Sequence, residues 1–371
     1  MKRLRNLITS GTILFIALAL LIVMPFACSK KKAETKEIKI GAVLPLTGVQ
    51  ADHGSDMKYA LEMALTGHRH PVKLIYEDSQ STPNGAVNAV SKLINIDRVP
   101  IIIGPITSSE VLATAPICEK NAVVLISPTA SNPKISDAGD YIFRTGPLAS
   151  EQGIAAAKYA LDKVYARKVA ILYMQDDTGL AYRRSFKEFF EKNKGAIIYE
   201  SGYPRDRADF RTELAKIKAV QPDVIYTPAT SQSMGYIAKQ KQELGITTPI
   251  IANFGIEGDA LLTVAGSAAE GIVYTAISVS ETFSKNFEAQ FKKTPGIGAP
   301  LAYDVLSIIL QLVEADCTTA NDFKTGLYKI SEFPGVCGKV SFDDKGDAHR
   351  DVVLKIVKDK AFIQIEGMFN D

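Results

Sequence analysis

Short apolar segments alternate with amphipathic segments from residue 38 onward. In the first part of the chain this pattern predicts strands over 38–44, 72–77, 100–103 and 123–126 and helices over 55–65, 84–96 and 110–119. The first of these helices places Met57, Leu61, Ala64 and Leu65 on one face at the three- and four-residue spacing of an α-helix. The units are of the βαβ type, and their continuously apolar strands suit a parallel sheet covered by helices on both faces.

A second series of the same units begins with a helix at 151–162. The pattern then predicts strands over 168–173, 196–199, 223–226, 249–252 and 271–276 and helices over 180–193, 210–220 and 233–244. An apolar helix at 300–314 and strands at 336–342, 352–357 and 362–365 follow. We therefore expect an α/β protein with two open doubly wound lobes. Such sheets bind ligands at the carboxyl ends of their strands, so two facing lobes would form a ligand cleft that closes by a hinge.

The first 27 residues have the layout of a signal peptide. Three basic residues among the first five positions precede an uninterrupted apolar run over 13–27, which is shorter than the roughly 20 residues that span a bilayer. Cys28 stands where a bacterial lipoprotein carries its lipid, although Pro25 and Phe26 depart from that signal. Residues 28–37 read as a polar tether. We expect an exported, lipid-anchored protein on the periplasmic face of a bacterial membrane; the alternative is an uncleaved anchor.

Composition and charge limit the classes of function. The 371 residues suggest two domains, and 46% hydrophobic residues are ordinary for a globular protein. The formal charge is +2, but removal of residues 1–27 would leave 40 basic and 41 acidic residues. A near-neutral body lacks the basic surface that nucleic acid binding requires, so we expect no nucleic acid partner.

Three cysteines follow Cys28. Disulfides persist outside the cytoplasm, so Cys317 and Cys337 could close one loop late in the chain. Cys118 would then be left over on the apolar side of a predicted helix, where a small buried residue is a better interpretation than a nucleophile. The sequence alone leaves the pairing open.

Motifs for catalysis and metal binding are missing from the sequence. It contains no phosphate-binding glycine loop, no dinucleotide fingerprint after the first strand, no zinc-protease motif and no nucleophile elbow. His68 and His70 lie in a polar turn, where solvated side chains are a better interpretation than a metal site. We therefore expect no enzyme, no metal and no cofactor.

Small hydroxyl residues gather directly after two predicted strands. One group lies at 104–109, before a helix, and the other at 127–133. Unpaired N–H groups at a helix N-terminus, together with hydroxyls beside them, can hold a carboxylate without a buried cation. The alternative is that Ser108 and Ser131 only cap a helix or shape a turn. These residues alone leave both interpretations open.

At these loops the sequence resembles the periplasmic substrate-binding proteins of branched-chain amino acid ABC transporters, the type I Leu/Ile/Val-binding family. The resemblance covers nearly all of residues 38–367. It depends on six segments in the family's order, which lie at 38–48, 77–83, 104–109, 127–133, 209–226 and 338–347. Each segment is a weak signal alone, and the six together are specific.

The resemblance implies the type I periplasmic-binding-protein fold, with three crossovers forming the hinge. The N-terminal lobe would comprise 38–150 and 278–353, and the C-terminal lobe 151–277 and 354–371. The chain would be the extracytoplasmic solute-binding component of an ABC importer, without catalysis. It would work as a monomer that captures a small amino acid, with the branched-chain type favoured, and delivers it to the permease subunits in the membrane.

The resemblance also assigns ligand-binding residues in the N-terminal lobe. Ser108 and Ser131 would bind the ligand carboxylate, and Thr107 and Thr129 would add contacts from the same two loops. His53 occupies the place where the first loop of the family usually offers an aromatic side chain over the ligand.

The C-terminal lobe departs from the family pattern. Thr178 and Thr230 stand where aromatic residues are common, and Phe254 stands where an acid normally holds the ligand ammonium. A buried ammonium without a counter-charge is expensive. Either Glu257 turns inward as the substitute, or it lies on a solvent-facing loop and the ligand has no ammonium. The alternatives are thus uptake of an amine-free aromatic or aliphatic carboxylate or a short amide, or a role as a ligand-sensing receptor.

Overall fold

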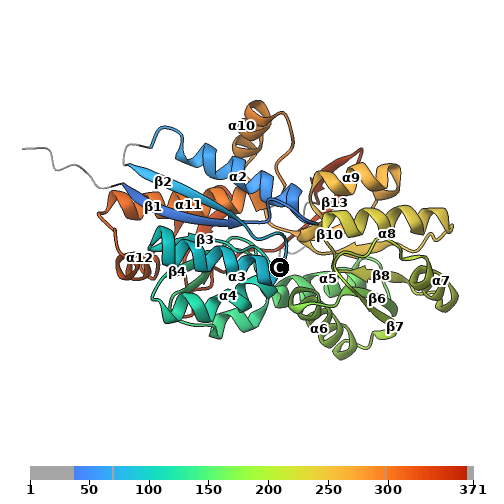
Figure 1. Ribbon diagram of the computed structural model, residues 1–371. Coiled ribbons are helices and arrows are strands. Elements are labelled where there is room, and N and C mark those ends of the chain that lie inside the picture. The colour runs from blue at the N-terminus through green and yellow to red at the C-terminus, as the bar shows by residue number, and fades with distance from the viewer. Residues whose placement is uncertain (1–36, 69–70, 297, 366–371) are drawn as a thin grey trace, which may run out of the picture. The chain divides into compact units, whose positions relative to one another are not determined.

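The computed structural model describes residues 37–68, 71–296 and 298–365. The expected signal peptide, the lipid attachment at Cys28 and nearly all of the tether lie outside these residues. Within the described ranges, no helix has the length and apolar character needed to cross a bilayer. Two large sheets with helices on both faces make up this part of the chain (Figure 1). The expected α/β fold with two doubly wound lobes is confirmed.

The first sheet has five parallel strands in the order β2-β1-β3-β4-β5. Its central strands are apolar and buried, as expected for a sheet covered on both faces. The strands are β1 (Ile38–Leu44), β2 (Val72–Asp78), β3 (Ile101–Ile103), β4 (Val124–Ser127) and β5 (Ile142–Arg144).

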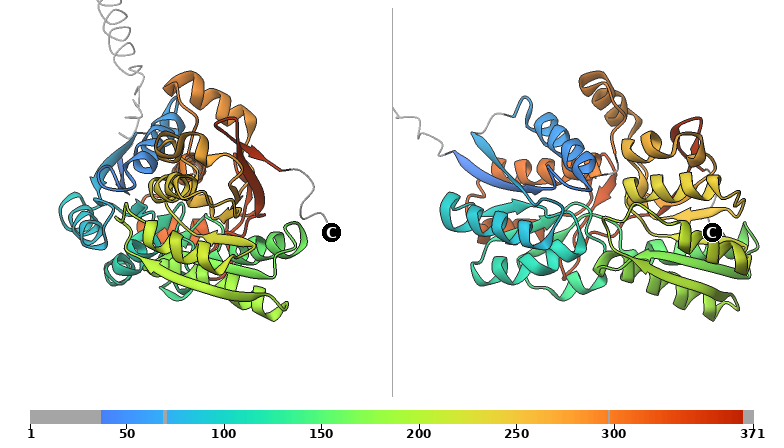
Figure 2. Two further views of the ribbon diagram at one scale, coloured as in Figure 1. Left: turned by 90° about the vertical axis from the view of Figure 1, so that its right-hand side faces the viewer. Right: turned by 45° about the vertical axis from the view of Figure 1, so that its right-hand side comes forward.

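Helices from distant parts of the chain cover the first sheet. One face carries α3 (Pro83–Lys92) and α4 (Ser108–Lys120), and the other carries α2 (Ala51–Leu65), α11 (Gly298–Glu314) and α12 (Ala320–Leu327). The α11 helix is apolar on most of its circumference because it packs between the sheet and its neighbours. Figure 2 shows the orange α11 returning to the blue α2. We call this sheet with its helices the N-terminal lobe.

The second sheet repeats the same strand order. Its parallel part runs β7-β6-β8-β9-β10, and β13 and β14 add an antiparallel edge. The strands are β6 (Lys168–Met174), β7 (Ala196–Tyr203), β8 (Val224–Thr227), β9 (Ile250–Ala252), β10 (Val273–Ala276), β13 (Val353–Lys358) and β14 (Ala361–Gln364).

Helices again lie on both faces of this sheet. One face carries α5 (Ala149–Asp162) and α6 (Asp177–Lys192), and the other carries α7 (Arg211–Val220), α8 (Ser231–Glu243) and α9 (Asp259–Ala265). We call this group the C-terminal lobe; the residue boundaries expected for the lobes stay a prediction. The remaining elements are η1 (Leu93–Asp97), η2 (Pro133–Asp137), η3 (Phe254–Ile256), η4 (Gly266–Ala269), α10 (Glu281–Phe291), β11 (Phe333–Gly335) and β12 (Gly338–Val340).

The chain passes between the two large sheets three times: after β5, after β10 and between β12 and β13. Two buried arginines tie the first of these connections to the third. Arg144 binds Asp347 at 2.6 Å, and Arg350 donates to the carbonyl of Thr145 at 2.6 Å and to Asp304 at 3.2 Å. Buried charges are tolerated when they are paired in this way, and removal of one partner is strongly destabilising.

The elements β5, α9, α10 and α12 were not predicted from the sequence, and two predicted elements differ for a reason visible in the backbone. The helix expected over 84–96 ends at Lys92 and continues as the π-helical turn η1, whose end is fixed by the left-handed backbone of Arg98. The strand expected over 336–342 is instead half of a hairpin, in which β11 and β12 are joined at a turn and Gly338 has φ +89°. A glycine accepts this conformation without the strain that a side chain would introduce.

The Cys317–Cys337 disulfide that the sequence left possible is not formed: both thiols are free in the structure, as is that of Cys118. The amide of Cys337 bonds to Asp304 near the start of α11, whereas Cys317 follows the end of the same helix. The helical rise from position 304 to position 317 is about 20 Å. A disulfide needs Cα atoms only about 4.4–6.8 Å apart, so the length of α11 keeps the two cysteines from pairing.

Candidate functional site

A cavity lies between the carboxyl ends of the two parallel sheets. Its lining comes from loops that follow strands in both lobes, as doubly wound sheets require. The cavity volume is about 50 Å3, which indicates a small solute. Seventeen residues line it: Gln50, His53, Met57, Ile106, Thr107, Ser108, Thr129, Ser131, Met174, Thr178, Arg205, Ala229, Thr230, Asn253, Phe254, Gly255 and Gly298.

Thr107 begins α4 at the edge of the cavity. Its hydroxyl donates to Glu110 Oε2 at 2.8 Å, and the same carboxylate oxygen accepts from the Thr107 amide at 3.1 Å. This capping box fixes the direction in which the N-terminus of α4 points. Burial raises the pKa of the Glu110 carboxyl. The Thr107 hydroxyl is thus occupied by the helix cap, although the residue lies at the cavity.

The two hydroxyl loops of the N-terminal lobe are tied to each other by Ser108. Its Oγ accepts hydrogen bonds from the amides of Ser131 at 3.2 Å and Asn132 at 3.1 Å. The Thr129 hydroxyl donates to the carbonyl of Ile106 at 2.8 Å. Ser131 Oγ, in contrast, is buried and makes no hydrogen bond of normal length to a described residue; the hydroxyl of Tyr182 is the group nearest to interacting with it. Among these hydroxyls, the one on Ser131 is ready to contact a ligand.

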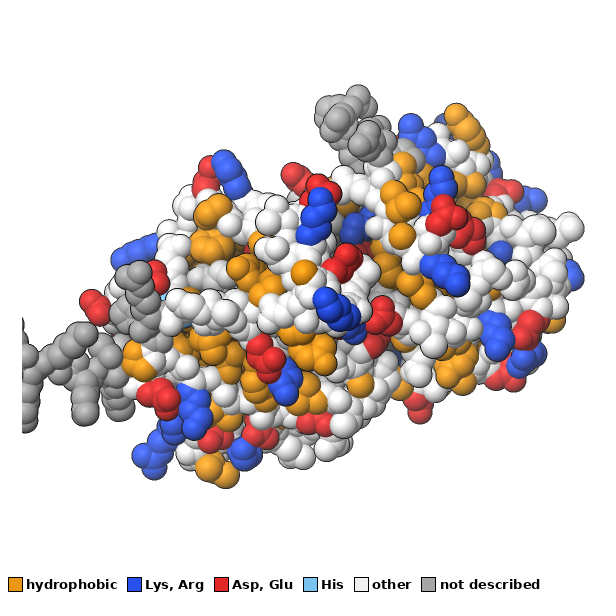
Figure 3. Space-filling model, turned by 90° about the horizontal axis from the view of Figure 1, so that it is seen from above, with side chains coloured by type: hydrophobic (Ala, Val, Ile, Leu, Met, Phe, Trp, Pro, Cys, Tyr) orange, Lys and Arg blue, Asp and Glu red, His pale blue; other side chains and the backbone are white. Residues whose placement is uncertain are grey.

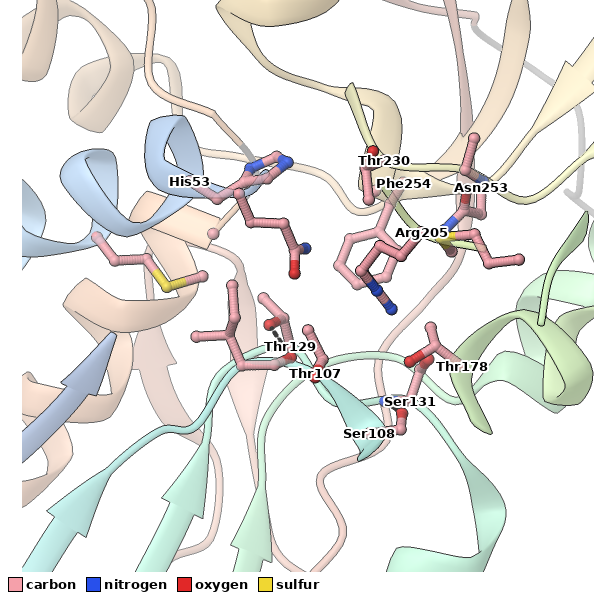
Figure 4. Close-up of a pocket in the computed structure, with 17 residues that line it drawn as sticks. His53, Thr107, Ser108, Thr129, Ser131, Thr178, Arg205, Thr230, Asn253 and Phe254 are labelled. Carbon is pink, nitrogen blue, oxygen red and sulfur yellow. Dashed lines mark hydrogen bonds between the residues drawn. The ribbon is translucent and has the colours of Figure 1, made fainter. Parts of the chain in front are cut away.

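The C-terminal lobe contributes a cation that the sequence analysis missed. Arg205 follows β7, and its Nε donates to Asp176 Oδ2 at 2.8 Å while Nη2 contacts the same oxygen. The other carboxylate oxygen, Oδ1, caps α6 by accepting from the Gly179 amide at 2.8 Å. Arg205 therefore lines the cavity with a charge that pairs directly with Asp176 and that also interacts electrostatically with the buried Glu110 carboxyl. Figure 4 shows its guanidinium directed into the cavity.

Thr178 and Thr230 lie at the N-termini of two helices of the C-terminal lobe. Thr230 is the N-cap of α8; its Oγ1 accepts from the Ser233 amide at 3.2 Å and donates to the Ser233 hydroxyl at 3.0 Å. Thr178 lies in the first turn of α6, and its buried Oγ1 lacks a partner among the described residues. Thr178 and Ser131 come from opposite lobes and lie close to each other in Figure 4. Both are therefore placed to share one ligand group.

The polarity of the cavity favours an anion. The helices α4, α6 and α8 begin at its edge, and helix N-termini carry partial positive charge and unpaired N–H groups. Arg205 adds a full positive charge. Among the described residues that line the cavity, none is an aspartate or a glutamate. No group of three or more metal-ligating side chains occurs in the described part of the chain either.

Phe254 forms part of an apolar wall. It lies in the short helix η3, is buried together with Tyr182 and Leu301, and faces the cavity beside Thr230 and Arg205 (Figure 4). The other apolar lining residues are Met57, Ile106, Met174 and Ala229. The site thus combines a polar, positive end with a hydrophobic side.

Glu257 is kept out of the cavity lining. Its carboxylate binds Lys355 Nζ at 2.9 and 3.1 Å and accepts from the Tyr274 hydroxyl at 2.8 Å. The residue is buried, so it does not lie on a solvent-facing loop, the alternative that the sequence left open. Its charge is balanced by Lys355, which leaves it poorly placed to hold a ligand ammonium.

His53 lines the cavity from α2, together with Gln50, which the sequence analysis also missed. The ring Nε2 of His53 lies 3.4 Å from the hydroxyl of Ser231 in the other lobe, and that hydroxyl donates to Asp52 at 2.7 Å. Gln50 could have been identified from its position after the first strand, since loops at that edge of the sheet bind ligands in such folds.

Direct contacts join the two lobes at the rim of the cavity. The Asn132 side-chain amide, through Nδ2, donates to the carbonyl of Asp177 at 2.6 Å, and the backbone amide of Asp177 donates to the Ser109 hydroxyl at 3.3 Å. On another side, Lys293 binds Asp56 at 2.6 Å and Asp259 at 3.2 Å. The cavity is therefore bordered by side chains and backbone of both lobes that contact one another.

Charged groups on the face drawn in Figure 3 show no comparable organisation. Acidic and basic side chains are interspersed over both lobes there. This face therefore lacks the asymmetry of charge that Arg205 and the helix N-termini give to the cleft.

Comparison with known proteins identifies a family and relatives with this architecture. Residues 37–361 match the family model described as periplasmic binding protein. The Leu/Ile/Val-binding protein of Escherichia coli K12 is 25% identical over 331 residues, which cover 85% of this chain and 89% of that protein.

Two solved structures have the same fold. A branched-chain amino acid transporter substrate-binding protein from Streptococcus pneumoniae, in complex with isoleucine, has a TM-score of 0.82 and 25% identity, and the match covers 89% of this chain and 99% of that one. A solute-binding protein of an ABC transporter from R. palustris, in complex with benzoate, has a TM-score of 0.83 and 21% identity, with 89% and 95% covered. By its sequence over 37–361 and by this cleft between two doubly wound lobes, the chain belongs to the periplasmic binding protein family.

Proposed function

We propose that this solute-binding protein of an ABC importer captures a small carboxylic acid that has no ammonium group. The observation that carries the proposal is the composition of the cavity: Arg205 and three helix N-termini reach it, and no acid is among its described lining residues. A carboxylate would find Arg205, Ser131 and Thr178 at one end. An ammonium would find no counter-charge, and burying it unpaired is expensive.

The anionic end of the solute would be shared by both lobes. Arg205 presents a planar fork that matches a carboxylate, and such charge-assisted hydrogen bonds are stronger than neutral ones. The buried hydroxyls of Ser131 and Thr178 would donate to the same group. Phe254 and its apolar neighbours would then cover the hydrocarbon part of the solute. The role is binding and delivery to a permease, as in the family, and involves no catalysis.

A branched-chain amino acid is the second candidate. It is supported by what the relatives are named for: the E. coli protein for Leu, Ile and Val, and the S. pneumoniae protein for its bound isoleucine. The R. palustris protein, which binds benzoate, shares only the fold at 21% identity. The two candidates differ in one chemical group, the α-ammonium, and can therefore be separated by a single comparison.

Leucine and 4-methylpentanoate have the same carbon skeleton and differ only in that group. We expect 4-methylpentanoate or benzoate to raise the thermal unfolding temperature, because a ligand at a hundredfold excess over Kd stabilises the native state by about 2.7 kcal/mol. Calorimetry should give leucine at least about tenfold weaker affinity than 4-methylpentanoate. Tighter binding of leucine would contradict the amine-free solute and support the second candidate. If no carboxylate binds, the proposed function is wrong.

Replacement of Arg205 by Gln tests the cation. A hydrogen bond to a charged group contributes about 1.5–3 kcal/mol, so Arg205→Gln should weaken the binding of 4-methylpentanoate or benzoate by about tenfold to a hundredfold. The matched control is Arg183→Gln, which removes an arginine that pairs with Glu200 and does not line the cavity. Circular dichroism checks the fold of both variants. Equal affinities in the two variants would remove Arg205 from the site.

The two serines of the N-terminal lobe should behave differently. Ser108→Ala leaves the amides of Ser131 and Asn132 without an acceptor, which should lower the free energy of unfolding by about 1–3 kcal/mol. Ser131→Ala removes a hydroxyl that makes no hydrogen bond of normal length to a described residue, so it should weaken carboxylate binding while leaving stability nearly unchanged. Urea denaturation and calorimetry measure the two effects. A stability loss at Ser131 as large as that at Ser108 would contradict this division of roles.

Export and lipid anchoring are proposed from the N-terminal sequence, with Cys28 as the attachment site. Cys28→Ser should move the protein from the membrane fraction to the soluble extracytoplasmic fraction, because the polar tether would have no lipid to hold it. Fractionation followed by immunodetection measures the distribution. Persistent membrane association of the variant would instead point to an uncleaved apolar anchor.

A further inference from the structure

Away from Ser131 and Thr178, the cavity ends at the first turn of α2. Figure 4 shows His53 on the opposite side of the cavity from those two hydroxyls. Gln50 precedes it by three residues, which places both side chains on the same side of the helix start. The backbone amide of Gln50 donates to the Ser81 hydroxyl at 3.2 Å, which holds this turn in place. The far end of the solute would therefore lie near Gln50 and His53.

The hydrogen-bonding capacity of His53 is partly committed. Ser231 donates its proton to Asp52 Oδ2 at 2.7 Å, so its oxygen faces the Nε2 of His53 at 3.4 Å as an acceptor. With the Ser231 proton directed to Asp52, a proton on His53 Nε2 would complete this contact and would direct the nitrogen to the other lobe, not to a ligand. His53 then provides ring surface to the cavity, and Gln50 is left as the polar group to consider.

Gln50 carries an unused acceptor. The residue is 8% exposed and lines the cavity, and its Oε1 is buried without a hydrogen-bond partner among the described residues. Buried polar atoms in native proteins are nearly always satisfied, by protein, water or ligand. A solute with a hydrogen-bond donor at this end would supply the missing partner. A solute with only hydrocarbon there would leave the oxygen unpaired and displace any water from it.

We propose that Gln50 determines specificity by accepting a hydrogen bond from an uncharged donor, a hydroxyl or an amide N–H, at the end of the solute opposite its carboxylate. The inference rests on the proposed function, since it presupposes a small carboxylate held by Arg205, Ser131 and Thr178. It narrows the solute class to acids with a second, polar terminus. A site that contains such an acceptor rejects the isosteric analogue that lacks the donor.

Two pairs of acids of equal size test the assignment. 5-Hydroxypentanoate is compared with hexanoate, and 4-hydroxybenzoate with 4-methylbenzoate; in each pair a hydroxyl replaces a methyl group. Calorimetry on the wild-type protein should show the hydroxy acid binding about tenfold or more tightly in at least one pair. The Gln50→Leu variant should lose that preference, because leucine cannot accept the hydrogen bond. Thermal unfolding without ligand checks that the variant is folded.

Gln290→Leu is the matched control, because Gln290 lies on the exposed side of α10 and should leave the preference intact. Equal or tighter binding of the methyl acids in both pairs by the wild-type protein would overturn the inference. So would a hydroxyl preference that persists in Gln50→Leu. If none of the four acids binds, and 4-methylpentanoate and benzoate also fail, the proposed function itself is contradicted and the role of Gln50 falls with it. Binding of 4-methylpentanoate without any hydroxyl preference contradicts the role of Gln50 alone.

Discussion

The loops that follow parallel strands all lie at one edge of the sheet, and in this chain two such edges face each other. The two sheets have the same strand order, so the loops after β3, β6 and β8 all start helices at the cavity. The N-termini of α4, α6 and α8 consequently meet around one small space. Glu110 caps α4 and Asp176 caps α6, but neither carboxylate lines the cavity, and no described lining residue is an acid. An anionic ligand is the group that this arrangement stabilises, and the chemistry of the site follows from that constraint.

Asp176 makes the cation of the site tolerable without neutralising it fully. One of its oxygens caps α6 and the other binds two nitrogens of Arg205. The third guanidinium nitrogen, Nη1, makes no hydrogen bond to any described residue, so it is available on the cavity side. An arginine without a partner would be costly to bury, whereas one fully enclosed by carboxylates would have little attraction left for a ligand. Because Asp176 is shared between the cap of α6 and Arg205, the charge of Arg205 is partly balanced and still attracts a ligand.

The architecture could be predicted from the sequence because the local periodicity of apolar residues indicates strands and helices. β1, for example, was expected at its observed bounds, and the loops predicted after the strands line the cavity. The roles of individual side chains were less accessible, because they depend on partners far along the chain. Ser108 is tied to a loop more than 20 residues away, and Glu257 is engaged by Lys355, 98 positions later. No local pattern encodes such pairs.

Arg205 was missed for a related reason. It lies in a run of charged residues after β7 that reads as a solvent-exposed loop, and most of that run is indeed exposed or partly exposed. What draws Arg205 into the cavity is Asp176, 29 residues earlier, at the start of the next helix in space. A contact between distant residues also explains why the disulfide is absent. The α11 helix is visible in the sequence, but the contact of Cys337 with Asp304 near the start of that helix, which keeps Cys337 away from Cys317, is not.

Capture of the solute and closure of the lobes are linked by the first turn of α6. The backbone of Asp177 bonds to Asn132 and Ser109 of the other lobe, and the next residue, Thr178, offers its free hydroxyl to the cavity. Ser131 reaches the same space from the N-terminal lobe. In the proposed mode of binding, one carboxylate would contact both hydroxyls and Arg205 while these rim contacts are made. The solute would then stabilise the closed arrangement by its differential affinity for it, which is the requirement for a ligand to shift such an equilibrium.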